Sequence, residues 1–305
     1  MDIEQFFEQQ LAQWPEAAAR YEALNGVRLK ELEVDGIRYR MQCNPARIVS
    51  SGAKVDAASI GKRPCFLCGK NRPAQQIVLP WGGHYEILVN PFPIFRRHLT
   101  IPEVSHTPQR IGSRLGDMLD LAHDLPEFTL FYNGPHCGAS APDHAHFQAA
   151  PRGQMPIEQQ WQALAGEPVA HLGEAKLYLL NEQPRTTVVI VSPRREDALT
   201  LAQEVISRLP LQEEAPEEPM LNLLALYEEG RWTMLLFPRQ KHRPACYSEA
   251  DETRRLLCSP ASVDMGGLFI LPRPEDFEKM TAHDIRQILQ EVCLPPSAIR
   301  RELLK

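Results

Sequence analysis

The side chains with the most chemistry in this 305-residue sequence lie in one stretch, NGPHCGASAPDHAHFQAAP, from Asn133 to Pro151. Residues two apart point to the same face of a strand, so His144, His146 and Gln148 would share one side. A lone H-x-H is most often part of an ordinary wet strand face, and this interpretation stays open. A neutral imidazole on such a face can also act as a nucleophile or as a metal ligand.

The loop before this strand favours a functional site over a wet surface. It contains Gly138, Ala139 and Ser140, which can bring backbone N–H groups and one hydroxyl close to an anion. Phosphate oxygens accept hydrogen bonds of this kind. A nucleophile beside a phosphate-binding loop indicates phosphoryl or nucleotidyl transfer.

A second group is the pair Cys65 and Cys68 in PCFLCGKN. A C-x-x-C pair can be a redox pair, two metal ligands or a coincidence. A redox pair is typical of a helix start after a strand, whereas Pro64 and the turn-like GKNRP indicate a knuckle. Two thiolates need two further ligands for a closed tetrahedral zinc site. The other five cysteines are irregularly spaced, which favours a reducing, cytoplasmic setting over a disulfide-bonded protein.

The elements that would position these residues follow a clear order from residue 76 to residue 151. They are the strands HYEILVNPFP and HLTIPE, the helix PQRIGSRLGDMLDLAHDL, and the strands FTLFYNG and HAHFQAAP. This order predicts an antiparallel meander with one helix packed on it. Residues 172–244 repeat the order more faintly, and the strand that corresponds to HAHFQ is WTMLLFP, without histidines.

Outside these two units, the sequence predicts an N-terminal amphipathic helix, a hairpin that turns at Asp35-Gly36, and a closing helix within residues 272–292. The predicted fold is α+β, with two lobes built on antiparallel sheet with packed helices. Residues 1–155 would form the catalytic lobe, and residues 156–305 a degenerate second lobe that completes the substrate site.

Composition and charge exclude some classes of protein. A net charge of −6 gives no general basic field, so neither a nucleic-acid binder nor a binder of anionic membranes is expected. No run of apolar residues is nearly as long as a membrane span requires. The N-terminal segment carries acids early and has no basic region before an apolar block, so it is not expected to be a signal peptide.

The run NGPHCGASAPDHAHFQ resembles the active-site signature of the transferase branch of the histidine-triad superfamily. This branch includes galactose-1-phosphate uridylyltransferase, ATP adenylyltransferase and GDP-hexose phosphorylase. Its members carry H-x-H-x-Q where the hydrolases carry a third histidine, so Gln148 is typical of the transferases. One departure is that Ser140 lies four residues before His144, one more than in the family, so Asp143 looks like an insertion. The resemblance covers residues 38–152, and the C-terminal half matches only in outline.

The resemblance implies catalytic roles for His146, Gln148 and Ser140. His146 would take a nucleoside monophosphate as a covalent phosphoramidate, and its second ring nitrogen would then be held by a backbone carbonyl. Gln148 would donate to a non-bridging phosphate oxygen and could not transfer a proton. In YEILVNPFPIFRRHLTIPEVSH, Asn90 fills the place of an asparagine that contacts ribose or phosphate, although a plain turn at Asn90-Pro91 is an equal alternative.

The same resemblance implies a metal site. The tetrapeptide CFLC is similar to that of metal-bearing uridylyltransferases, in which two histidines complete the ligand set. Here they would be His106, after the Ile-Pro strand, and His144. A structural Zn²⁺ is therefore expected, and no organic cofactor.

Basic residues supply further candidates for phosphate binding. The family often places an arginine from the early region near the nucleotide phosphates, and Arg47 fits this, unless it belongs to a solvated basic loop. In FPRQKHRPACY, alternation along an extended segment would aim Arg239, Lys241 and Arg243 the same way. Lys241 and Arg243 are candidates for the phosphate of the second substrate. His98, beside two arginines, is interpreted as a rim residue.

The expected function is ping-pong nucleotidyl transfer from a nucleotide sugar or a dinucleoside polyphosphate to phosphate or a sugar phosphate. Hydrolysis of the same substrates is one alternative, and a nucleotide-binding or zinc-binding sensor without turnover is another. The resemblance also implies a homodimer as a possible assembly. Neither the base nor the sugar of the substrate follows from any motif in the sequence.

Overall fold

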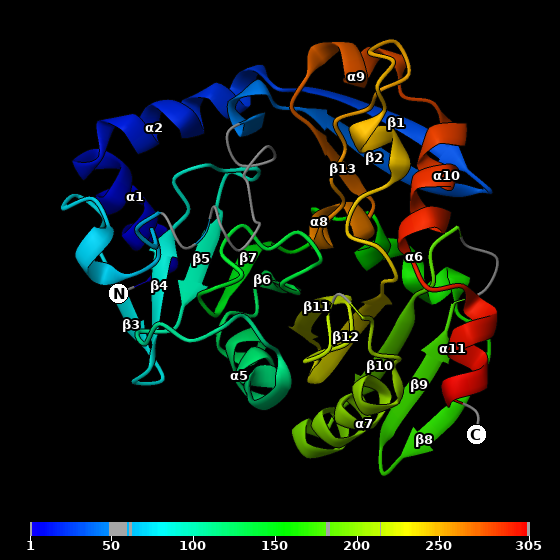
Figure 1. Ribbon diagram of the computed structural model, residues 1–305. Helices are drawn as coiled ribbons and strands as arrows, with labels where there is room; N and C mark the ends of the chain where they lie inside the picture. The colour runs from blue at the N-terminus through cyan, green and yellow to red at the C-terminus, as the bar shows by residue number, and fades with distance from the viewer. Residues whose placement is uncertain (1, 49–59, 61–62, 181–183, 214, 304–305) are drawn as a thin grey trace.

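The computed structural model describes residues 2–48, 60, 63–180, 184–213 and 215–303. Its centre is a ten-stranded antiparallel sheet with the spatial order β3-β4-β5-β7-β6-β11-β12-β10-β9-β8 (Figure 1). The strands are β3 (Leu79–Trp81), β4 (Tyr85–Val89), β5 (Leu99–Pro102), β6 (Phe128–Asn133), β7 (His146–Pro151), β8 (Ala170–Leu172), β9 (Ala175–Leu179), β10 (Val188–Ser192), β11 (Leu221–Glu228) and β12 (Arg231–Pro238).

The two halves of this sheet have the same construction. In chain order, β4, β5, α5 (Leu115–Asp124), β6 and β7 form the first unit, and β9, β10, α7 (Arg195–Arg208), β11 and β12 form the second. The fourth strand of each unit lies between the second and the third, and the units meet where β6 pairs with β11. The α+β fold class and the degenerate second copy are therefore confirmed, and β12 occupies the place that β7 has in the first unit.

A three-stranded sheet packs against the large sheet. It contains β1 (Arg28–Val34), β2 (Ile37–Cys43) and β13 (Leu268–Leu271). The predicted turn at Asp35-Gly36 is confirmed, since both residues have positive φ, 53° and 77°. The parallel pairing of β13 with β2 joins the two ends of the chain.

The remaining helical segments are mostly short. The helices are α1 (Ile3–Gln13), α2 (Pro15–Glu22), α6 (Ile157–Leu164), α8 (Ser262–Met265), α9 (Pro274–Lys279), α10 (Ala282–Val292) and α11 (Pro296–Leu303). The 3-10 helices are η1 (Ala23–Gly26), η2 (Pro45–Arg47), η3 (Gly69–Asn71), η4 (Gly112–Arg114) and η5 (Ala245–Ser248).

The two faces of the large sheet have different coverings. On one face, α5 and α7 pack on residues such as Phe147 and Ala149 of β7 and Leu130 of β6. On the other, β2, β13 and α10 cover the second half, so that Leu224 and Leu235 are buried there. His146 and Gln148 alternate with Phe147 and therefore point to this second face, in the first half of the sheet. The candidate site lies over this first half, which the three-stranded sheet does not cover.

Several predicted elements differ in extent. The single N-terminal helix is divided at Trp14, because Pro15 cannot donate the helical hydrogen bond and disfavours helical geometry in the residue before it. The closing helix is likewise two helices, and α10 begins at a capping box formed by Thr281 and Asp284. The strand predicted from His144 begins at His146.

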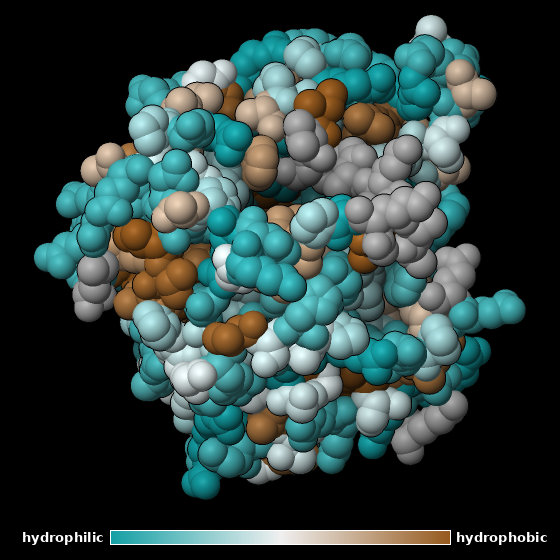
Figure 2. All heavy atoms as spheres, turned by 60° about the vertical axis from the view of Figure 1, so that its left-hand side comes forward, coloured by the Kyte–Doolittle hydropathy of each residue, from teal (hydrophilic) through white to brown (hydrophobic). Residues whose placement is uncertain are grey.

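Among the described residues, no helix has the length and apolar character needed to cross a bilayer. The side of the molecule seen in Figure 2 is hydrophilic over most of its area, and its apolar side chains gather in a few small groups. Exposed large apolar side chains on the described surface include Leu29, Phe66 and Val104.

Candidate functional site

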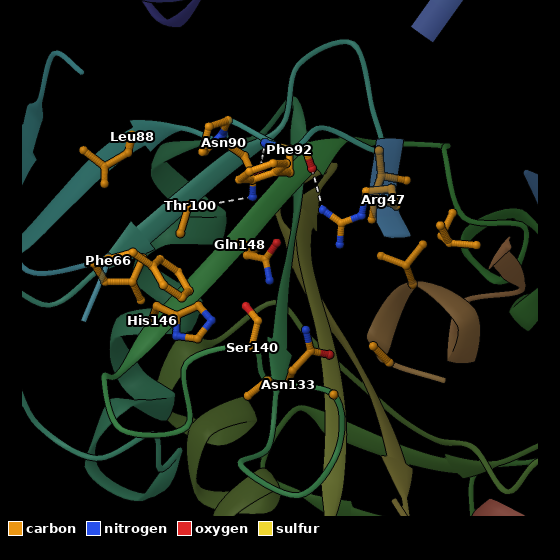
Figure 3. Close-up of a pocket in the computed structure, with 18 of the residues that line it drawn as sticks. Arg47, Phe66, Leu88, Asn90, Phe92, Thr100, Asn133, Ser140, His146 and Gln148 are labelled. Atoms are coloured by element: carbon orange, nitrogen blue, oxygen red, sulfur yellow. Dashed lines mark hydrogen bonds between the residues drawn. The ribbon is translucent and has the colours of Figure 1, made fainter. Parts of the chain in front are cut away.

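A cavity of about 760 Å³ lies over the second face of the first half-sheet. Its floor comes from β4, β5, β6 and β7, and its walls come from α2, the segment around Cys65, the loop before β7 and the region around α8. Both halves of the chain line it. Figure 3 shows His146 and Gln148 pointing into this cavity, with Asn133 and Ser140 on one side and Arg47 at the far side.

His146 has the state that a nucleophilic histidine requires. Its Nδ1–H donates to the backbone carbonyl of His144 at 2.8 Å, which leaves Nε2 as the nitrogen without a proton. Burial lowers the pKa of His146 to about 4, so the ring is neutral at ordinary pH. The side chain of Gln109 fixes the backbone of His146. Its Oε1 accepts from His146 N at 2.8 Å, and its Nε2 donates to His146 O at 3.0 Å.

Gln148 is oriented by His98, which the sequence interpretation placed on the rim. His98 is fully buried instead, between the rings of Phe95 and Phe131. The backbone N–H of Ile94 donates to His98 Nδ1 at 3.2 Å, so Nε2 carries the proton and donates to Gln148 Oε1 at 2.9 Å. The amide –NH₂ of Gln148 is then the group that faces the cavity.

Asn133 is a cavity residue that sequence reasoning did not assign. Its Oδ1 accepts from Asn222 Nδ2 at 3.0 Å and from the backbone N–H and hydroxyl of Ser262 at 2.8 and 2.7 Å. These bonds fix the amide so that its –NH₂ group lies on the cavity side, as Figure 3 shows. The available signal was strand alternation, because Asn133 is two residues from Phe131 on the site face of β6.

The predicted phosphate loop borders the cavity, and Gly138, Ala139 and Ser140 all line it. Gly138 has a φ of 96°, and a Cβ there would lie 2.6 Å from the Cβ of Ala261. A side chain would therefore be strained and would also displace the segment before α8. The loop can approach this segment closely only because residue 138 is glycine.

Asn90 and Thr100 lie at the part of the cavity formed by β5 and the end of β4. Asn90 Oδ1 accepts from the backbone N–H of Phe92 at 2.8 Å, so the turn interpretation is correct locally. Its Nδ2 donates to Thr100 Oγ1 at 2.8 Å, which leaves the Thr100 hydroxyl proton for another acceptor. Both residues also line the cavity, and Thr100 lies directly opposite Gln148 across β5 and β7.

Of the basic candidates, Arg47 and Arg243 reach the cavity and Lys241 does not. Arg47 donates to Phe92 O, its Nε is buried without a partner, and burial lowers its pKa to about 10. Lys241 pairs with Glu291 outside the cavity. Arg239 is completely buried and donates to backbone carbonyls and to Asn222.

The alternation predicted for residues 239–243 fails because β12 ends at Pro238. The backbone N–H groups of Gln240 and Lys241 both turn to Val292 O. This replaces an extended strand with a turn, so Arg239, Lys241 and Arg243 point in different directions. Arg243 donates to Ser259 Oγ at 3.0 Å and stacks on Tyr247.

The four predicted metal ligands come together near the start of β7. The ligand atoms of Cys65, Cys68, His106 and His144 all lie within 4.8 Å of one another. His144 Nδ1 is 3.3 Å from Cys65 Sγ, and His106 Nδ1 is 3.2 Å from Cys68 Sγ. Ligands of tetrahedral zinc, with bonds of about 2.0–2.3 Å, are separated by about 3.3–3.8 Å. This group could hold a metal ion.

Two further contacts orient the imidazoles of this group. His144 Nε2 donates to the backbone carbonyl of Glu103 at 2.8 Å, so Nδ1 is its free nitrogen. Asp143, the residue that departs from the family pattern, places Oδ2 3.6 Å from His106 Nε2. Its other oxygen is buried without a hydrogen-bond partner. Asp143 therefore lies against the metal group and does not line the cavity.

Comparisons with known proteins agree with this architecture. Residues 6–151 match the family model described as a domain of unknown function (DUF4922), and residues 175–299 match the model described as GDPGP1-like, C-terminal domain. No curated protein matches the sequence.

Among solved structures, the chain is similar to yeast Ap4A phosphorylase. The complex with Ap4A has 16% identity and a TM-score of 0.58, and the match covers 92% of this chain and 97% of that one. The complex with AMP has 17% identity and a TM-score of 0.55, with coverage of 94% and 97%. At this identity the likeness shows that the fold is shared along nearly the whole of both chains.

Proposed function

We propose that this chain, which has the two-lobed fold expected of the transferase branch of the histidine-triad superfamily, is a nucleotidyltransferase that works through a nucleotidyl-histidine. One observation carries this assignment. His146 is neutral, its Nδ1–H is held by a carbonyl, and its other ring nitrogen lies in a cavity beside two oriented amides.

In the first half-reaction, the lone pair on His146 Nε2 attacks the α-phosphorus of a nucleotide sugar or a dinucleoside polyphosphate. The P–N bond forms as the bond from phosphorus to the leaving phosphate oxygen breaks, and that oxygen keeps the electron pair. The ring becomes cationic, and the His144 carbonyl stabilises the proton on Nδ1. The amides of Gln148 and Asn133 donate to the non-bridging oxygens, where negative charge accumulates.

In the second half-reaction, an oxygen of inorganic phosphate or of a sugar phosphate attacks the same phosphorus. The P–N bond breaks and neutral His146 is regenerated. Arg47 and Arg243, on the cavity wall away from His146, are the candidates to bind the phosphates of the leaving group and the acceptor. Lys241 is no longer a candidate, because it pairs with Glu291 outside the cavity.

Transfer is favoured over hydrolysis because Gln148 cannot act as an acid or a base. A histidine at this position could activate water or protonate a leaving group, whereas an amide held by His98 only donates hydrogen bonds. A sensor without turnover is disfavoured, because binding alone does not require a neutral histidine with one nitrogen held and the other open to the cavity.

The metal group fits a structural Zn²⁺ with four protein ligands and no position left for substrate. When bound, the ion would supply a rigid link between the Cys65–Cys68 segment and the catalytic strand. His144 would be a ligand through Nδ1, while its backbone carbonyl holds the proton of His146. Seven free thiols fit a reducing, cytoplasmic setting. The proposed homodimer is supported by the family resemblance alone.

The decisive experiment is isolation of the intermediate. The protein is incubated with α-³²P-labelled substrates: diadenosine tetraphosphate, GDP-hexoses and UDP-hexoses. We expect an acid-labile, base-stable label on the protein that His146→Ala abolishes. The matched control His283→Ala, an exposed histidine of α10 outside the cavity, should keep the label. Absence of label with every substrate contradicts the mechanism.

The products then separate the candidate functions. Release of a nucleoside diphosphate that depends on inorganic phosphate supports a phosphorylase. Exchange between a nucleotide sugar and a hexose 1-phosphate supports an acceptor of the sugar-phosphate class. Release of a nucleoside monophosphate without any acceptor identifies a hydrolase, and tight binding without any product identifies a sensor.

A further inference from the structure

Arg63 is a cation of the cavity that no motif singled out. It lies two residues before Cys65, and it lines the same cavity as His146 and Ser140. Its Nη2 donates to the backbone carbonyl of Ser140 at 2.7 Å, which ties it to the phosphate loop. Its guanidinium also stacks over Phe66, with the central carbon 5.1 Å from the ring centroid.

The hydrogen-bonding capacity of Arg63 is only partly used. Its Nε is buried and has no hydrogen-bond partner. No carboxylate of the described residues forms an ion pair with it, in contrast to Arg72 of the same segment, which pairs with Glu86. A guanidinium with an unpaired buried N–H is costly unless an anion completes it, and phosphate is the anion that its fork fits best.

The segment that carries Arg63 is also the segment that the metal would hold. Its apolar contacts with the catalytic loop are few, since Cys65 and Leu67 pack mainly against Ala141. The backbone hydrogen bonds of this segment join residues that are close in sequence, such as the bond from Cys68 N to Cys65 O at 3.3 Å. Bonds from a metal to Cys65 and Cys68 on one side and to His106 and His144 on the other would fix its position relative to Ser140.

We infer that Arg63 binds the phosphates of the substrate beside the Gly138–Ser140 loop, and that the metal at Cys65 and Cys68 couples to substrate binding by holding Arg63 in place. The ligand chemistry is that of a nucleoside diphosphate group. This rests on the proposed function for the identity of the ligand, but it is a statement about binding and does not depend on formation of the covalent intermediate.

The test is a double-mutant cycle read by calorimetric titration with ADP, GDP and UDP, each without an acceptor. With the nucleotide that binds best, we expect Arg63→Gln to weaken binding about tenfold or more, the usual effect of losing a hydrogen bond to a charged group. Cys68→Ser, checked for loss of metal by elemental analysis, should weaken binding by a similar factor. The double variant should bind no more weakly than either single variant.

Two further variants keep the result interpretable. Lys176→Gln removes an exposed positive charge of β9, outside both the cavity and the metal group, and should bind nucleotide like the wild type. Arg63→Lys keeps the charge without the fork and should give an intermediate affinity. All variants are compared for melting temperature and circular dichroism, so that unfolding is recognised as such.

Wild-type affinity in Arg63→Gln overturns the assignment of Arg63. Multiplying effects of Arg63→Gln and Cys68→Ser overturn the coupling to the metal. Failure of the proposed function gives a different result, in which nucleotides bind with the pattern above but His146 is never labelled.

Discussion

His98 Nε2–H donates to Gln148 Oε1 at 2.9 Å, and this bond links a fully buried ring to a side chain that lines the cavity. Burial lowers the pKa of His98 to about 3, so the ring stays neutral and its Nδ1 continues to accept from Ile94 N. The orientation of the Gln148 amide is therefore set by a backbone N–H, through a neutral imidazole. Gln148 can only present its –NH₂ group to a phosphate.

Replacing His98 with Phe keeps a ring between Phe95 and Phe131 but removes both hydrogen bonds. We expect nucleotidyl transfer to His146 to slow about tenfold to a hundredfold, because a misplaced donor loses most of its effect on the transition state. The affinity for substrate should change little. His98→Gln, which retains a donor, should restore part of the rate. Single-turnover labelling and equilibrium binding measure the two effects separately, and equal losses in both would indicate a merely structural role.

Replacing Gln148 with His introduces a group that can transfer protons at the cavity wall. We expect the labelled intermediate to decay to nucleoside monophosphate faster in Gln148→His than in the wild type when no acceptor is present. Gln148→Asn, which shortens the side chain without adding a titratable group, is the matched control and should not accelerate the decay. Decay of the isolated labelled protein in acceptor-free buffer gives both rates. If Gln148→His is as stable to water as the wild type, the choice between transfer and hydrolysis is set elsewhere.

Local patterns predicted most of the elements, but not how distant ones pair. The strands β4, β5, β6 and β7 and the turn at Asp35-Gly36 are predictable because each depends on neighbouring residues. The pairing of β13 with β2 depends on residues at opposite ends of the chain, and no local pattern encodes it. The sequence predicts one N-terminal helix, and the structure divides it at Trp14, before Pro15.

The site divides in the same way. Cys65, Cys68, His106 and His144 were predicted from the resemblance, and they form one group that could hold a metal. Residues whose role depends on how other elements orient them could not be predicted from the resemblance. Asn133 owes its orientation to Asn222 and Ser262, and Gln109 lies before α5 in an irregular segment that the sequence predicts to be helical. Such roles depend on contacts between separate elements, which a single sequence does not contain.

The pH dependence follows from His146. Its pKa is lowered from 6.5 to about 4, chiefly because burial disfavours the charged imidazolium. The neutral ring is the nucleophile, so its reactive fraction is nearly constant above about pH 5 and falls only as the pH approaches 4. We expect the single-turnover labelling rate to be the same at about pH 5.5 and about pH 7.5. A rate that halves near pH 6.5 would show an unperturbed histidine and contradict the burial of this ring.

The remaining prediction concerns Asp143. Its carboxylate lies 3.6 Å from His106 Nε2, longer than a hydrogen bond but close enough to favour a proton on that nitrogen. A proton on Nε2 leaves Nδ1, which is 3.2 Å from Cys68 Sγ, as the metal-binding nitrogen. We expect Asp143→Asn to lower the affinity for Zn²⁺ about tenfold, the lower end of the effect of an orienting carboxylate.

Competition with a chromophoric chelator measures the affinity without any assay of activity. Asp251→Asn, in an exposed loop outside the metal group, should leave the affinity unchanged. Equal affinity in both variants would mean that Asp143 has no part in holding His106.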